Sequence, residues 1–291
     1  MHESYSNGDE QVTPHIIGVI FAIMSASAWG TGDFSGGIAT RSRSQFQVLF
    51  LVSIYGIIIL AALGLLTGES LPSSRDVSWA LIAGLTGSFG IAALYKGLSL
   101  GNAVAVAPTA AVIGAGLPVV FNCLSMGPPG SVQVLGFIFA IFGIWIVSRQ
   151  PDGHRHASSQ ELILSIIAGI GFGGFFIMIA QVNKGLVFFP LVLSKAAAII
   201  LAATILSLRR ERFPSPGRNP MAAIAGLFDA GGNVFFMLAK QFTRLDVAAV
   251  LASMYPAVTV ILAWWILKEK VSSSQWWGVS LCVMAITLIG I

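Results

Sequence analysis

Long apolar runs, separated by short polar breaks, dominate the chain after a polar segment at residues 1–13. A helix needs about 20 apolar residues to cross a bilayer, whereas strands of a membrane barrel would alternate apolar and polar positions. The pattern therefore predicts an all-α membrane protein with about ten transmembrane helices. The runs lie at residues 15–37, 46–66, 77–95, 103–125, 132–148, 162–182, 188–208, 220–239, 247–267 and 275–291.

The two halves of the chain resemble each other. A shift of about 142 residues aligns Ala107, Ala110, Gln133 and Gly136 with Ala249, Ala252, Gln275 and Gly278. Five spans per half is an odd number, so the halves would insert in opposite orientations, as in many secondary transporters. We therefore expect a polar tail at 1–13, a first five-helix repeat at 14–148, a linker at 149–161 and a second five-helix repeat at 162–291.

Composition agrees with a polytopic membrane protein, because mean hydropathy is +0.85 and only 10% of residues are charged. The net charge is +4, and the basic residues lie at the ends of the runs. This placement indicates cytoplasmic loops and no nucleic-acid partner. Most loop arginines and lysines follow odd-numbered runs, which predicts that both termini face away from the cytoplasm.

Motifs for other membrane functions are missing from the sequence. Cys123 and Cys282 lie in apolar runs without metal-ligand spacing, and the histidines lie in the tail or at the margins of spans. No Walker A, His-Glu-x-x-His or Gly-x-Ser-x-Gly motif is present. We therefore expect no catalytic residues, no metal site and no cofactor, and neither an ATP-driven pump nor a membrane hydrolase.

A single carboxylate, Asp229, lies near the middle of the apolar run at 219–239. Such a group costs roughly 2.5–3.5 kcal/mol at mid-membrane, so it should face protein or water. Asn233 is one helical turn further on and lies on the same face. Asp229 is either part of a transport site or a buried polar group that ties two helices together.

Two other charges lie within the spans. Asp33 follows Trp29 by one turn and is either a second carboxylate of a cavity or a cap near the interface. Lys195 could pair with Asp229, attract an anionic group of a substrate, or extend its stem to the interface. Trp29 and Tyr255 are candidates for stacking on a ligand, although aromatic residues in spans also serve packing.

Three prolines lie inside predicted spans, namely Pro108, Pro118 and Pro256. Proline removes a helix hydrogen bond and can bend or interrupt a helix. These positions are therefore candidate hinges, with fixed bends as the alternative.

The order and spacing of several elements resemble the EamA-type transporters of the drug/metabolite transporter superfamily. They are Trp29-Gly30 in the first half, and Asp229, Tyr255-Pro256-Ala257-Val258-Thr259, Glu269, Gln275 and Gly278 in the second. The first half departs from the pattern, with Gly127 at the position of Glu269 and Gly114 at that of Pro256. The resemblance implies a ten-helix carrier of two inverted repeats, commonly an exporter of small metabolites, amino acids or drugs, with cytoplasmic termini.

Together these observations predict a secondary transporter of the plasma membrane that moves a small organic solute by alternating access. Export coupled to protons through Asp229, with Asp33 as a second carboxylate, is the leading hypothesis. An uptake carrier for a sugar or another nutrient is the first alternative, and a non-transporting membrane scaffold is a rival from another class. The expected partners are the solute, protons and the lipid bilayer, and the sequence leaves open whether the protein forms a homodimer.

Overall fold

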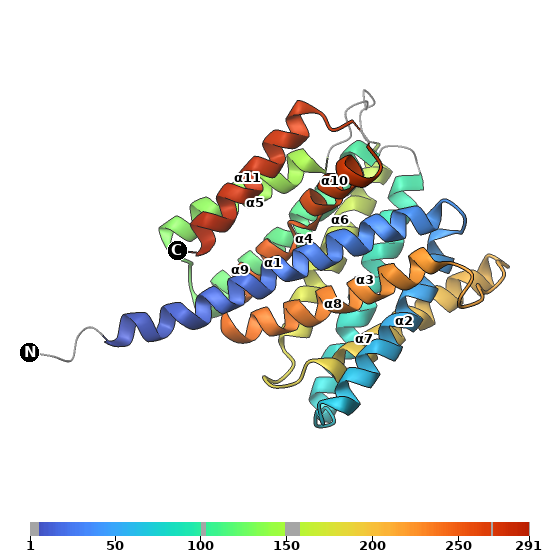
Figure 1. Ribbon diagram of the computed structural model, residues 1–291, viewed down its shortest axis with the longest axis horizontal. Coiled ribbons are helices and arrows are strands. Elements are labelled where there is room, and N and C mark those ends of the chain that lie inside the picture. Colours follow the sequence, from blue (N-terminus) through green and yellow to red (C-terminus); the bar gives the residue numbers. More distant parts are fainter. Residues whose placement is uncertain (1–5, 100–102, 149–157, 269, 291) are drawn as a thin grey trace, which may run out of the picture.

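The computed structural model describes residues 6–99, 103–148, 158–268 and 270–290, and its elements of regular structure are all helices. Figure 1 shows them packed into one bundle. The helices are α1 (Ser6–Thr40), α2 (Gln45–Leu66), α3 (Ser74–Ser99), α4 (Ala103–Met126), α5 (Ser131–Val147), α6 (Ser159–Ala180), α7 (Phe188–Leu208), α8 (Pro220–Phe242), α9 (Leu245–Ala252), α10 (Tyr255–Ile266) and α11 (Ser273–Gly290).

Membrane-spanning capacity is distributed along the whole chain. Within the described residues, nine helical stretches are long and apolar enough to cross a bilayer, with α9 and α10 together forming one of them, and α5 is a shorter apolar helix. The all-α membrane fold of about ten spans is thus confirmed. Helix α1 begins at Ser6, inside the segment predicted as a polar tail, and its apolar part starts at Pro14.

The ninth span, predicted as one run at 247–267, is interrupted. Helix α9 ends at Ala252 and α10 begins at Tyr255, so the break falls at Ser253 and Met254. Pro256 has no N–H to donate to the carbonyl of Ala252, which gives a physical reason for the break. By contrast, α4 continues through Pro108 and Pro118. The role of all three prolines as hinges stays a prediction.

Helix contacts follow the symmetry of two inverted repeats. Helix α1 packs on α8 and α3 packs on α6, and each of these contacts joins the first helix of one repeat to the third helix of the other. The second helices of the repeats, α2 and α7, pack on each other, and so do the last, α5 and α11 (Figure 1). The α3–α6 contact is close enough that a Cβ built on Gly171 would lie 2.6 Å from the Cα of Gly90.

Both ends of the described chain lie at the same end of the bundle, which we call the terminal end. The ring nitrogens of His15, near the start of the apolar part of α1, lie 2.9 Å from Thr243 Oγ1 and 3.0 Å from the carbonyl of Ile289 in α11. The opposite end, where α1 ends and α2 begins, is called the basic end because Arg41, Arg43 and the basic α7–α8 loop lie there.

Candidate functional site

A cavity of about 430 Å³ lies between the two repeats. Its described lining comes from α1, α2, α3, α4, α6, α7, α8, the break after α9 and the first residue of α10, while α5 and α11 contribute none of it. All six residues predicted to bind substrate or protons line this cavity, namely Trp29, Asp33, Lys195, Asp229, Asn233 and Tyr255. Their roles in binding stay predictions, but the fold brings them to one place.

Asp229 is held by two side chains. The Lys195 ammonium donates a hydrogen bond to Asp229 Oδ2, and the two side chains are only 14% and 25% exposed. The Asn233 amide nitrogen lies 3.3 Å from Asp229 Oδ1 and 2.6 Å from the Asp229 carbonyl oxygen, and donates to both. Of the three alternatives for Lys195, the structure therefore contains the ion pair. The lysine stem lies along α2, since a Cβ on Gly56 would be 3.7 Å from its Cδ.

Asp33 supplies the second carboxylate of the cavity. Its side chain is exposed to the cavity that it lines, one turn after Trp29. The neighbouring Gly32 packs on α8 so closely that a Cβ there would lie 3.3 Å from the backbone nitrogen of Asp229. Helix α1 therefore carries Asp33 into the same region as the Lys195–Asp229 pair.

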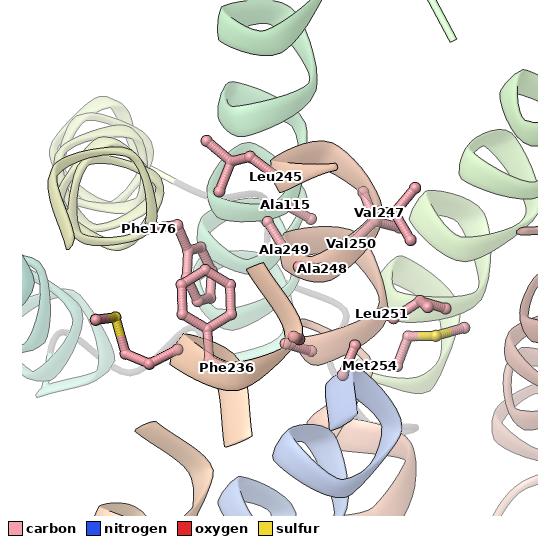
Figure 2. Close-up of a cluster of buried hydrophobic side chains, with 14 of the residues drawn as sticks. Ala115, Phe176, Phe236, Leu245, Val247, Ala248, Ala249, Val250, Leu251 and Met254 are labelled. Atoms are coloured by element: carbon pink, nitrogen blue, oxygen red, sulfur yellow. The ribbon is translucent and has the colours of Figure 1, made fainter. Parts of the chain in front are cut away.

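Aromatic rings bound the cavity on its terminal-end side, and the buried helix α9 lies beside them. Trp29 packs on Phe176 and Phe236 with ring centroids 5.7 and 6.1 Å away, and these two phenylalanines lie 4.7 Å from each other. Figure 2 shows them beside α9, every residue of which is buried. Trp29 can lie this close to α8 because position 232 is a glycine, where a Cβ would be 2.5 Å from the indole Cδ1.

Polar contacts join the helices at the terminal end. Lys240 donates to the carbonyls of Ala180 and Val182, at 3.1 and 2.6 Å. The carboxylate of Asp76 accepts hydrogen bonds from the backbone and side chain of Asn183, at 2.9 and 3.0 Å. These contacts connect α6 and its following loop to α8 and to the start of α3.

Two further charged groups complete these contacts. Glu69 accepts hydrogen bonds of 2.8 to 3.1 Å from the first backbone N–H groups of α7, where a carboxylate is favoured by the helix dipole. Arg244 donates to Asp246 and to the carbonyl of Gly127 at 2.9 Å, and the Asp246 hydrogen bond raises the pKa of the guanidinium. The sequence did not predict that Glu69, Arg244 and Asp246 join helices, because charged residues at the ends of spans are typical of any membrane interface.

Toward the basic end the lining continues to the last residue of α1. Thr40, which is exposed, and Val48 near the start of α2 both line the cavity, as does Leu94 in the second half of α3. The cavity therefore extends from mid-depth toward the basic end. The lining also includes residues that no sequence pattern indicated, namely Ser53, Ser88, Phe172, Phe175, Ser194 and Ser253.

Comparison with known proteins agrees with this architecture. The EamA-like transporter family matches residues 16–149 and again 159–291, so the chain is a membrane transporter belonging to that family. A protein from Rickettsia conorii called an S-adenosylmethionine uptake transporter is similar, with 23% identity over 274 residues, 90% of this chain and 88% of that protein. A crystal structure with 17% identity has a TM-score of 0.71 and covers 93% of this chain and 95% of its own, which shows the shared fold.

Proposed function

We propose that this transporter is a secondary carrier that moves a small organic solute across the plasma membrane by alternating access. The observation that carries the proposal is the mid-depth cavity between the two inverted repeats, with the Lys195–Asp229 ion pair in its wall. Carriers built from inverted repeats bind their substrates at this position. In this proposal the structure corresponds to a state open toward the basic end.

Export coupled to protons remains the leading mechanism. During a transport cycle a carboxylate can release a proton and bind the solute or a basic side chain in its place. Asp229 and Asp33 both line the cavity. Lys195 and Asn233 would then hold Asp229 between protonation events. The aromatic seal at Trp29 would separate the cavity from the terminal end in this state.

Uptake is the second candidate direction, and the Rickettsia conorii relative favours it by its name. On this alternative the solute would be a nutrient, such as a sugar or S-adenosylmethionine itself. The cavity volume of about 430 Å³ lies within the usual range for sites that hold metabolites. A non-transporting scaffold is the rival reading, in which the ion pair only joins α7 to α8.

A thermal-shift screen of the detergent-purified protein tests the proposal. The panel contains amino acids, sugars, nucleosides, cationic drugs and S-adenosylmethionine. A bound solute at 100 times its dissociation constant should add about 2.7 kcal/mol of stability. We expect at least one solute to stabilise the wild type and to lose its effect in Asp229→Asn.

The control is Glu211→Gln, which also removes one negative charge but lies in the α7–α8 loop outside the described cavity lining. It should keep the shift. A hit should then be transported by the wild type reconstituted in liposomes, with the pH gradient varied to test coupling. A solute shift that persists in Asp229→Asn would assign this carboxylate to structure, and a stabilising solute that is never transported would favour the scaffold.

A further inference from the structure

The charged side chains in the described lining of the cavity do not balance. They are Asp33, Lys195 and Asp229, two carboxylates and one ammonium. Lys195 is already bound to Asp229, and this pair is neutral as a unit. The carboxyl group of Asp33 is therefore left without a basic partner in the described lining.

Asp33 is also available to a ligand. No described side chain forms a hydrogen bond or an ion pair with its carboxylate, and its side chain is exposed to the cavity. Arg41 and Arg43 follow α1 at the basic end, but neither belongs to the described lining of the cavity. A carboxylate in the wall of a protein cavity interacts with a charged ligand more strongly than it would in bulk water.

Aromatic side chains line the same cavity as this carboxylate. Trp29 lies one turn before Asp33, and Phe172 and Phe175 line the cavity from α6. Aromatic faces attract ammonium, sulfonium and similar cations through the ring quadrupole. A cavity lined by a carboxylate without a basic partner and by aromatic rings is therefore better suited to an organic cation than to a sugar or an anion.

We propose that the solute of this carrier is an organic cation, and that Asp33 binds its positive group while the Lys195–Asp229 pair stays intact. The inference rests on the proposed transport function and names its substrate class. It differs from the coupling hypothesis in giving Asp33 a direct contact with the solute, whereas Asp229 remains occupied by Lys195.

The test measures binding of two matched pairs of probes to the purified full-length protein by isothermal titration calorimetry. S-adenosylmethionine carries a sulfonium charge that S-adenosylhomocysteine lacks, and choline has an uncharged isostere in 3,3-dimethyl-1-butanol. We expect the wild type to bind the charged member of at least one pair more tightly. Asp33→Asn should weaken this binding roughly tenfold or more, because it removes the Coulombic attraction between the carboxylate and the cationic group.

Two further variants show whether the carboxylate itself is required. Asp33→Glu keeps the charge and should keep the preference for the cation, and Glu211→Gln should behave as the wild type. Equal binding of both members of each pair, no binding of either cation, or unchanged cation binding by Asp33→Asn would each overturn the inference. If the thermal-shift screen then finds a neutral or anionic solute that is transported, the carrier proposal holds and only the inference of a cationic solute fails.

Discussion

At the residue scale, the rotation of α7 about its axis determines which group the Lys195 side chain contacts. The sequence places both Lys195 and Asp229 inside apolar runs, which indicates that neither can face lipid without a large cost. It does not decide between pairing and extension to the interface, because both are sterically available to a long side chain. The contact of the lysine stem with Gly56 of α2 and the bond to Asp229 decide it.

The ion pair predicts non-additive effects on stability. Lys195→Met and Asp229→Asn should each reduce the free energy of unfolding by about 3 kcal/mol, since each leaves a largely buried charge without its partner. The double variant should lose less than the sum of the two, and less than the worse single variant. Denaturant unfolding of the wild type, the two single variants and the double variant in one detergent measures the coupling energy between the two residues. Additive losses would show that the interaction between Lys195 and Asp229 does not stabilise the protein.

At the element scale, close helix contacts depend on glycines at points where two backbones meet. Position 171 of α6 is such a point, because its nearest neighbours are backbone atoms of Gly90 and Thr86 in α3, at 2.6 and 2.7 Å from a Cβ placed there. Backbone atoms cannot rotate away as the end of a side chain can. The contact therefore fixes the spacing of α3 and α6, which both contribute to the cavity wall.

Gly171→Ala should consequently destabilise the protein by about 1–3 kcal/mol, the usual cost of overpacking a dense interior. Gly116→Ala is the matched control in α4, because a Cβ at that position meets no atom within 4 Å. It should be neutral or stabilising by up to about 1 kcal/mol, owing to the better helix propensity of alanine. Melting temperatures of the two variants in the same detergent test the difference, and equal losses would contradict the packing argument.

At the scale of the whole molecule, the two ends of the bundle differ. On the terminal-end side, the Trp29–Phe176–Phe236 cluster borders the cavity, and hydrogen bonds such as those of Lys240 to the end of α6 join the helices. The cavity lining reaches the basic end at Thr40. Alternating access would require the terminal-end contacts to open as the basic end closes.

Cysteine labelling in membrane vesicles tests this asymmetry. In a background without the native Cys123 and Cys282, Gly37→Cys places a thiol in the cavity and Lys184→Cys places one at the terminal end. A membrane-impermeant maleimide should label the two from opposite sides, and the charge distribution predicts that Gly37→Cys is labelled from the cytoplasm. Labelling of Gly37→Cys from the side that labels Lys184→Cys would mean that the cavity opens at the terminal end. Cytoplasmic labelling of Lys184→Cys would reverse the orientation and agree with the family resemblance.

The sequence by itself determined the architecture of this protein. In lipid each backbone N–H and C=O must be satisfied within its own segment, so the length and polarity of each run largely specify a spanning helix. The odd number of spans per half then implies inverted repeats, and the contacts of α1 with α8 and of α3 with α6 confirm them. The six candidate residues followed from being polar or aromatic in apolar runs.

Only the tertiary structure decided how those residues meet. The pairing of Lys195 with Asp229, the unpaired state of Asp33 and the break at Ser253 depend on how the helices rotate and approach one another. These quantities are set by contacts between residues far apart in the chain, such as His15 with Ile289 or Gly32 with Asp229. A local hydropathy pattern carries no information about them, and therefore the closed end of the cavity could not be predicted from the sequence.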